Sequence, residues 1–495
     1  MPVGVVASTH FPVWKPREKD VKRYFHFDRY VSPVLAEKLA NDPHYVATHS
    51  FFPLIRFHES WTKYRKVGKP RKKKVRPLRY AAHLDAIIFA KYRADLASLY
   101  ENELARRNLA DVPVAYRQIL DEHGKAKSNI EIARDVFSVV RKLKDCVVTV
   151  VDIKSYFESL DHANIEKQWS NLIGGTLPAD HQSVFKAVTK YSVVDLDKVE
   201  QRLSLLGTDI NGVNRKSRRL RKIDVLRREG KKQLCTPQEF RSLIAGGDPA
   251  QPSLIQKNGF PFGIPQGTPI SDLIANFYLI DFDEIMSQWA QALGGIYRRY
   301  SDDIVVVLPR TSVFSPDEPK LRLQTEIRKH GSKLEIQEKK VCVGEFVTNG
   351  LGIEWRHISG TSSRNGLEYL GFEFDGMRVK IRNSTLSNAW RKMKRQAHGH
   401  AFAFVRHYRD KGLSWIRANY PHASLERSIL QDVTFHQDTG YDTWTFVKYA
   451  RRASHCFVGF HPIFSKQTRR YRYFTKIMIA AALEEAITKV KPRSP

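Results

Sequence analysis

The sequence predicts an α+β fold, in which helices pack on a mixed sheet and a mostly helical segment ends the chain. Apolar residues follow helical spacing between residues 83 and 142, where Ala, Leu and Glu favour helix. The segment CVVTVVDI at 146–153 is rich in β-branched residues and is too short and apolar for a surface helix, so it predicts a buried strand. With 495 residues, 42% of them hydrophobic, the chain can bury a large core in roughly two to four packed units.

The later segments continue this alternation of helix and strand. Residues 268–293 show helical apolar spacing, and IYRRYSDDIVVVLP at 296–309 predicts two strands joined by a tight Ser-Asp turn. LEYLGFEFDGMRVKIR at 367–382 predicts a hairpin whose turn is Asp375-Gly376. From about Ser384 the pattern is helical and rich in Arg, Lys, Tyr and Trp, which predicts a basic helical C-terminal region.

The charge is strongly positive and clustered. Lys and Arg number 82 against 52 Asp and Glu, a formal net charge of +30. Residues 63–76 hold nine basic side chains and no acid, and residues 215–232 hold ten against two acids. Such a balance favours a polyanionic partner, of which nucleic acid is the commonest, over a merely solubilising surface.

Cysteine usage and hydropathy indicate the compartment. The four cysteines lie about a hundred residues apart without a CxxC pair, which argues against a zinc site or a disulfide framework. No apolar run reaches the ~18 residues of a membrane span, and the N-terminus lacks a secretion signal. We therefore expect a cytoplasmic protein with no membrane partner.

Acidic residues stand at the predicted strand ends. Asp152 closes the strand CVVTVVD, and Asp302-Asp303 occupy the turn of the later hairpin. Hard carboxylate oxygens at such a place suit Mg²⁺, and two ions ~4 Å apart would activate a hydroxyl and stabilise a leaving pyrophosphate. The alternative is that Asp-Asp is an ordinary turn dipeptide.

Several motifs resemble those of reverse transcriptases, in the same order. DIKSYF (152–157), GIPQG (263–267) and YSDD (300–303) resemble motifs A, B and C of that family. LEIQEKK (334–340) and EYLGFEF (368–374) resemble motif D and the primer-grip motif E, and RPLRYAAHLDAII (76–88) resembles the fingers motif. The resemblance covers roughly residues 70–380 and implies a right-hand polymerase with fingers, palm and thumb. The implied parts are an N-terminal extension and fingers (1–145), a palm (146–345) with a basic insertion at about 195–250, a primer-grip hairpin (346–383) and a helical, basic, thumb-like domain (384–495).

The resemblance also implies site residues and a cofactor, two Mg²⁺ ions for which Mn²⁺ can substitute. The catalytic metal ligands would be Asp152, Asp302, Asp303 and the Ile153 carbonyl. Phe157 would exclude a 2′-hydroxyl, and Gln266 would line the nucleotide pocket. Triphosphate contacts would come from Arg76, Lys73 and Lys339, and support for the turn and the primer from Tyr300, Tyr369, Leu370 and Gly371. From the residues alone, Phe157 could be plain core, residues 263–267 only a turn, and Lys73 and Lys339 general surface charge.

The long interval from Glu158 to Asn258 and the basic C-terminal region resemble the bacterial defence-associated ("unknown group" and abortive-infection) reverse transcriptases. This implies an RNA template, with a dedicated non-coding RNA, dNTP substrates and a DNA product, primed on a 3′ end or on a protein hydroxyl, and a possible homo-oligomer. Two alternatives stay open: the reverse transcriptase of a mobile retroelement (group II intron- or retron-like), and a non-catalytic RNA-binding scaffold.

Overall fold

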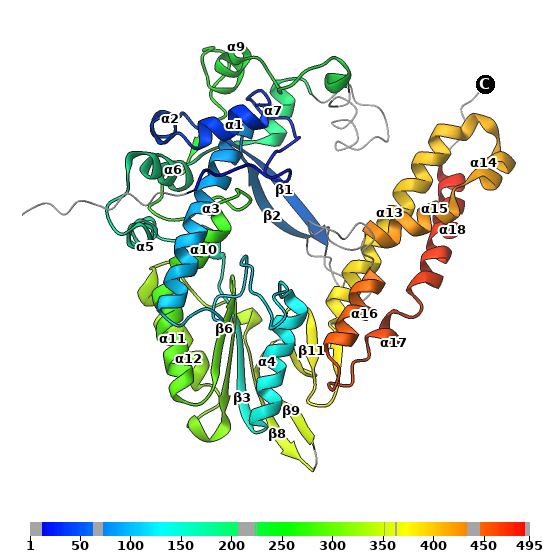
Figure 1. The fold of residues 1–495 in the computed structure, drawn as a ribbon. Coiled ribbons are helices and arrows are strands. Elements are labelled where there is room, and N and C mark those ends of the chain that lie inside the picture. The colour runs from blue at the N-terminus through cyan, green and yellow to red at the C-terminus, as the bar shows by residue number, and fades with distance from the viewer. Residues whose placement is uncertain are drawn as a thin grey trace, which may run out of the picture.

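The computed structural model describes residues 12–62, 73–205, 223, 225–350, 352–361, 364–432 and 446–490, and these form an α+β structure with a helical C-terminal region, as expected. Figure 1 shows an N-terminal part, a central sheet and a column of C-terminal helices. Most of the basic run 63–76 and half of the run 215–232 lie outside the described residues.

The central sheet is the predicted palm sheet. Its five antiparallel strands follow the order β6-β7-β3-β8-β9, so β3 lies in the middle. Both faces of β3 are buried, because a core cluster packs on each side of the sheet. The predicted strand and the predicted hairpin are confirmed. The strand bounds are β3 (Cys146–Asp152), β6 (Ile296–Tyr300), β7 (Asp303–Pro309), β8 (Cys342–Asn349) and β9 (Gly352–Gly360).

Side chains of β3 and β7 alternate between two cores, as the two-residue period of a strand requires. Val147 and Val151 join one cluster with helices α10 (Ser271–Tyr278), α11 (Ile280–Ala292) and α12 (Glu318–Ile327). Val148 joins another with helix α4 (Asn129–Leu143) and the C-terminal helices. Figure 1 shows α11 and α12 on one side of the sheet and α4 on the other.

The N-terminal part contains a second sheet of four strands in the order β2-β1-β4-β5. Its strands are β1 (Leu54–Thr62), β2 (Lys73–Tyr80), β4 (Ser192–Asp195) and β5 (Gln256–Lys257). The helices around it are α1 (Pro33–Ala40), α2 (Pro43–Thr48), α3 (His83–Arg106), α5 (His162–Ile173), α6 (Ala179–Thr189), α7 (Leu196–Arg202) and α9 (Pro237–Glu239). Residues 192–257 lie within the palm that the resemblance implies, yet β4 and β5 pair in this N-terminal sheet, which we call the fingers sheet after the fingers implied for residues 1–145.

The region 83–142 is less helical than its spacing predicts. Helices α3 and α4 are separated by residues 107–128, which the structure shows as turns and extended chain. Part of this segment pairs with β6, because the Val114 N–H donates to the Arg299 carbonyl (2.8 Å) and the Arg299 N–H donates to the Val112 carbonyl (2.9 Å). The expected helix over 268–293 likewise divides at Leu279, whose φ of −99° and ψ of 18° leave the helical region.

The expected hairpin at 367–382 is a three-stranded sheet of β10 (Leu367–Tyr369), β11 (Phe372–Phe374) and β12 (Val379–Ile381). The turn at Asp375-Gly376 is confirmed between β11 and β12. A further turn at Leu370-Gly371, with φ of +45° and +93°, joins β10 to β11. The expectation of one hairpin was therefore incomplete, because two residues in the left-handed region are enough to reverse the chain between such short strands.

The C-terminal region is helical, as predicted. Its helices are α13 (Asn383–Tyr408), α14 (Leu413–Asn419), α15 (His422–Asp432), α16 (Phe446–Cys456), α17 (Phe464–Thr468) and α18 (Tyr471–Lys489). Helices α13 and α18 run side by side (Figure 1). Among the helices that the structure describes, none has the length and apolar character needed to span a membrane.

Candidate active site

Strand pairing brings the predicted carboxylates together. Asp152, at the end of β3, lies directly opposite Asp303, at the start of β7. The Asp302 carbonyl accepts a hydrogen bond from the Ile153 N–H (2.9 Å), and Ser301 before it takes a left-handed φ of +59° to make the turn. Asp152 is buried at 5% exposure, and Asp302 and Asp303 are half-buried. The three aspartates thus meet at one end of the palm sheet.

The like charges of these carboxyl groups oppose one another. Burial, followed by the charges of Asp302 and Asp152, raises the pKa of Asp303 to about 7. Burial and Asp152 also raise the pKa of Asp302. Such shifts arise where carboxylates are crowded without enough positive charge, so this place favours a bound cation.

The donor set fits Mg²⁺. Carboxylate and carbonyl oxygens are hard ligands, and Mg²⁺ commonly takes only one or two carboxylates together with substrate phosphates. Across the described ranges, no three His, Cys, Asp or Glu side chains are already arranged around one point. Coordination of Mg²⁺ by these aspartates therefore stays a prediction.

A lysine faces the carboxylates, and it is Lys340 where the resemblance implies Lys339. The Lys340 ammonium group contacts the Asp152 carboxylate. The Lys339 side chain is exposed, and its carbonyl accepts a hydrogen bond from the Thr361 hydroxyl (2.5 Å). Both residues lie in the 3₁₀ turn η5 (Glu338–Lys340), where successive side chains point about 120° apart. The lysine that contacts Asp152 therefore stands one residue later in the sequence than the resemblance implies, and the side chain of Lys339 points in another direction.

The segment 263–267 is a loop that joins the palm to the fingers. Its Ile264 N–H donates to the Phe157 carbonyl (2.8 Å), and its Gln266 carbonyl accepts from the Arg79 N–H of β2 (2.9 Å). Gly267 has φ +115°, and a Cβ there would lie 2.4 Å from the Arg79 carbonyl oxygen. Only glycine fits such a position. The loop thus contacts β2 through Gln266 and the half-buried Phe157 through Ile264.

Two of the predicted cationic residues lie on β2. Arg76 is exposed, and its positive charge opposes the rise in the pKa of Asp302, which places it within electrostatic reach of the carboxylates. Lys73 begins β2, but its side chain lies outside the described part of the chain. The fingers strand therefore brings at least one cation toward the three aspartates.

The primer-grip residues also lie near the carboxylates. Tyr369 is 2% exposed, and burial followed by the charge of Asp303 raises the pKa of its hydroxyl group. The Leu370 carbonyl accepts a hydrogen bond from the Asn129 amide of α4 (3.1 Å), and the Gly371 carbonyl accepts from the Arg382 N–H (2.9 Å). The turn is thus fixed to the palm and to the start of the C-terminal helices.

Tyr300 lies beside the aspartate turn. Its ring centroid is 6.5 Å from that of Tyr116, which has a left-handed φ of +60°. Ser301, which follows Tyr300 in the turn, is buried at 3% exposure. Tyr300 thus lies between Tyr116 and the aspartate turn, and its supporting role stays a prediction.

A buried ion pair that the sequence analysis missed holds the aspartate turn in place. Arg299 and Asp283 are both fully buried, and the guanidinium donates to the carboxylate at 2.8 and 2.6 Å. Arg299 also donates to the Ser301 carbonyl (3.2 Å), and the Tyr297 hydroxyl donates to Asp283 (2.8 Å). A signal was present in the sequence, because Asp283 interrupts the apolar face of the helix predicted over 268–293.

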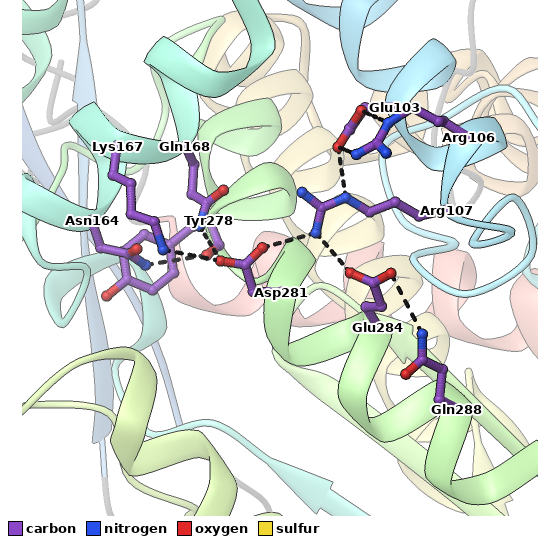
Figure 2. Close-up of polar contacts among 10 residues, drawn as sticks. All are labelled: Glu103, Arg106, Arg107, Asn164, Lys167, Gln168, Tyr278, Asp281, Glu284 and Gln288. Atoms are coloured by element: carbon purple, nitrogen blue, oxygen red, sulfur yellow. Dashed lines mark hydrogen bonds and ion pairs between the residues drawn. The ribbon is translucent and has the colours of Figure 1, made fainter. Parts of the chain in front are cut away.

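A second polar network ties the palm helices to the fingers (Figure 2). Arg107, after the end of α3, donates to Asp281 (2.8 Å) and Glu284 (2.9 Å) on α11. Asp281 also accepts from Gln168 of α5 (2.7 Å), and Glu103 accepts from Arg107 (2.6 Å). Arg107 therefore joins α3 to α11, and Asp281 extends the network to α5.

No family model and no curated protein matches this chain. Among solved structures, apo telomerase from Candida tropicalis, truncated from the C-terminal domain, is similar at a TM-score of 0.37 and 9% identity, over 71% of this chain and 61% of that one. Telomerase from Candida albicans in complex with a TWJ fragment of telomeric RNA is similar at 0.35 and 11%, over 90% and 64%. This chain thus spans less than two thirds of the length of either telomerase, and functional inference depends on the geometry of its own site.

Proposed function

We propose that this protein is an RNA-directed DNA polymerase that adds dNTPs to a 3′ end, or to a protein hydroxyl, by phosphoryl transfer. The supporting observation is the meeting of Asp152, Asp302 and Asp303 at the end of the palm sheet, facing a fingers strand that carries Arg76. Phosphoryl transfer needs fixed positive charge around the transferring phosphate and an in-line nucleophile. Metal ions held by the acidic residues can activate the nucleophilic hydroxyl, and the facing basic strand adds fixed positive charge around the phosphate.

Each residue has a role in this proposal. The three aspartates and the Ile153 carbonyl would hold two Mg²⁺ ions, or Mn²⁺, which when bound would activate the attacking hydroxyl and stabilise the leaving pyrophosphate. Arg76 and Lys73 bind the triphosphate, and Gln266 lines the nucleotide pocket. Phe157 occupies the space under the sugar and disfavours a 2′-hydroxyl. Lys340, which contacts Asp152, is better placed than Lys339 to meet the charge of the departing phosphates.

The same carboxylates distinguish this proposal from a non-catalytic RNA-binding scaffold. Burying three neighbouring carboxyl groups raises the pKa values of Asp302 and Asp303 and disfavours their ionised forms. A scaffold gains nothing from that arrangement, whereas a metal-dependent polymerase requires it. The electrostatics of the site therefore favour the enzyme.

We place the enzyme in bacterial antiviral defence, acting in the cytoplasm with a dedicated non-coding RNA. The support is the resemblance to defence-associated reverse transcriptases and the net charge of +30, which suits a structured RNA partner. A homo-oligomer belongs to the same proposal. A mobile-element reverse transcriptase would use the same site, and a neighbouring intron or repeat in the genome would indicate that alternative.

The decisive experiment is nucleotide incorporation by the purified protein on an RNA template with a DNA primer. We expect dNTP incorporation with Mg²⁺ or Mn²⁺, and a loss of at least about 100-fold in the Asp302→Asn/Asp303→Asn double variant. Its thermal midpoint should equal or exceed that of wild type, because the change removes like-charge repulsion. The exposed Glu122→Gln is the matched carboxylate control and should keep full activity.

Undiminished synthesis by the double variant would overturn the active-site assignment. The defence role has its own readout, which is phage plating on cells that express the wild type or the double variant. Equal plaque counts across a broad phage panel would reject that role whatever the incorporation assay showed.

A further inference from the structure

An aromatic platform stands at the edge of the fingers, just before the loop 263–267. Phe260 is 65% exposed and stacks on Phe262, with ring centroids 5.2 Å apart and an interplanar angle of 23°. The backbone beneath it is well anchored. The Asn258 amide donates to the carbonyls of Thr189 (2.9 Å) and Phe262 (3.2 Å), and the His162 N–H donates to the Pro261 carbonyl (2.9 Å). The exposed ring is therefore held in place by contacts within the protein itself.

A pocket of about 310 Å³ adjoins this platform. That volume lies at the lower end of the range for small-ligand sites and matches a single nucleotide better than a folded partner. Its walls come from the fingers sheet, from the start of the loop 263–267 and from Glu158. They include Arg56, Arg79, Tyr191, Lys257, Phe260 and Phe262.

One wall carries a guanidinium with unused hydrogen-bond donors. Arg79 is only 7% exposed, and its Nε and Nη1 have no hydrogen-bond partner among the described residues. Its guanidinium carbon lies 5.4 Å from the centroid of the Tyr191 ring. A buried donor without an acceptor is costly. An anion that enters the pocket would lie beside this guanidinium and be attracted by its positive charge.

The surrounding charge is positive. The Lys333 ammonium lies 5.5 Å from the Phe262 ring centroid, and Lys257 is exposed on β5. Arg56 is neutralised by Asp195 at 2.7 Å. Glu158 is the acidic side chain that lines the pocket. Cations interleaved with accessible aromatic rings are the composition that binds single-stranded nucleic acid, whose bases stack and whose phosphates pair with the cations.

We propose that the platform of Phe260 and Phe262 binds an unpaired nucleotide of a single strand, with its base on the exposed ring and its phosphate toward Arg79, Lys257 and Lys333. The inference rests on the proposed polymerase function and deepens it. Because the platform continues directly into the loop that contacts Phe157 and β2, a strand held there lies beside the candidate nucleotide site. The platform thus forms part of the path of the unpaired template strand.

Binding of dye-labelled 12-nucleotide U₁₂ RNA and T₁₂ DNA, measured by fluorescence anisotropy in EDTA without dNTPs, tests the platform apart from catalysis. Phe260→Ala should weaken binding of both single strands about 5- to 10-fold and leave a 12-base-pair duplex within twofold. Phe260→Trp should restore the affinity. The salt slope of log Kd should stay as in wild type for both variants, because stacking releases no counterions.

The lysines provide the complementary measurement. Lys257→Ala/Lys333→Ala should lower the salt slope by ~1.4, which is ~0.7 for each phosphate of a single strand that a lysine no longer neutralises. Matched controls are Phe314→Ala, whose side chain is fully exposed elsewhere on the surface, and Lys38→Ala on α1. Both should bind as wild type does.

Three results would overturn the inference: Phe260→Ala binding within twofold of wild type, equal weakening of single strand and duplex, or dissociation of a dimer in light scattering with unchanged oligonucleotide binding.

The Asp302→Asn/Asp303→Asn variant separates this inference from the proposed function. If it loses synthesis but keeps single-strand affinity, both hold. If wild type binds through Phe260 yet incorporates no nucleotide, the platform stands and the polymerase proposal fails. A preference for U₁₂ over T₁₂, or the reverse, identifies the kind of strand.

Discussion

A backbone hydrogen bond fixes the position of Phe157, whereas its side chain is only partly packed. Its carbonyl accepts a hydrogen bond from the Ile264 N–H (2.8 Å), and it belongs to the turn η1 (Tyr156–Glu158) that follows β3. The ring is only half buried against the palm core. Truncating the side chain should therefore open space beside the site while the loop 263–267 stays in place.

We expect Phe157→Ala to lower the preference for dNTPs over NTPs at least about tenfold in kcat/KM, because the space under C2′ becomes available. The free energy of unfolding should fall by about 1–3 kcal/mol, since a partly buried ring is lost. Tyr156→Phe is the neighbouring control. It removes the hydrogen bond to the Ala275 carbonyl (2.5 Å) at about 1 kcal/mol and should not change the dNTP preference. Unchanged discrimination in Phe157→Ala would show that the sugar gate lies elsewhere.

At the scale of elements, the β6–β7 hairpin depends on a buried charge. Arg299 joins the hairpin to α11 through Asp283, to the α10 carbonyl of Asn276 (2.9 Å) and to the turn itself through Ser301. The side chain of the neighbouring Arg298 is 23% exposed, donates to the Tyr297 carbonyl (2.9 Å) and lies 3.9 Å from the exposed Asp111 carboxylate. Two adjacent arginines on one strand thus have very different surroundings.

Arg299→Met should lower the free energy of unfolding by about 3–5 kcal/mol, because it leaves the Asp283 carboxylate buried without its cation. Arg298→Met should cost about 1 kcal/mol or less. Urea denaturation followed by circular dichroism measures both. If the two variants are equally stable, the Arg299–Asp283 pair does not hold the hairpin.

At the scale of the whole molecule, the palm, the primer-grip sheet and the C-terminal helices share one core. Phe457 is fully buried in that core, with its ring centroid 5.9 Å from that of Phe137 on α4 and 5.1 Å from that of Phe372 on β11. Arg141 of α4 also donates to the Gly459 carbonyl (2.7 Å). The thumb-like region expected at 384–495 is therefore packed into the palm and does not have a wholly separate core.

Phe457→Ala should lower the free energy of unfolding by about 3–5 kcal/mol and shift a transition shared by palm and C-terminal helices. Val458→Ala, at a neighbouring side chain that is 75% exposed, should change it by less than about 0.5 kcal/mol. Differential scanning calorimetry, with near-ultraviolet circular dichroism as a second probe, tests this. Two separate transitions, only one of them shifted by Phe457→Ala, would contradict a common core.

Local patterns in the sequence were enough to predict the strand that ends at Asp152, the Ser-Asp turn and the glycine-containing loop 263–267. A run of β-branched residues, a turn dipeptide and a left-handed glycine each act over a few residues, so composition and spacing reveal them. The same local signals grouped the aspartates as one candidate site before any contact was known.

Only the tertiary structure decided which distant segments meet. In the folded chain Lys340, and not Lys339, contacts Asp152, and Arg299 pairs with Asp283. Strands β4 and β5, from residues 192–257, pair within the fingers sheet. The tertiary structure also divided one expected hairpin into three strands. These outcomes depend on strand register and on burial between residues far apart in the chain. Hydrophobic spacing shows which face of an element is buried, but the partner on that face is selected by packing the whole chain around its cores.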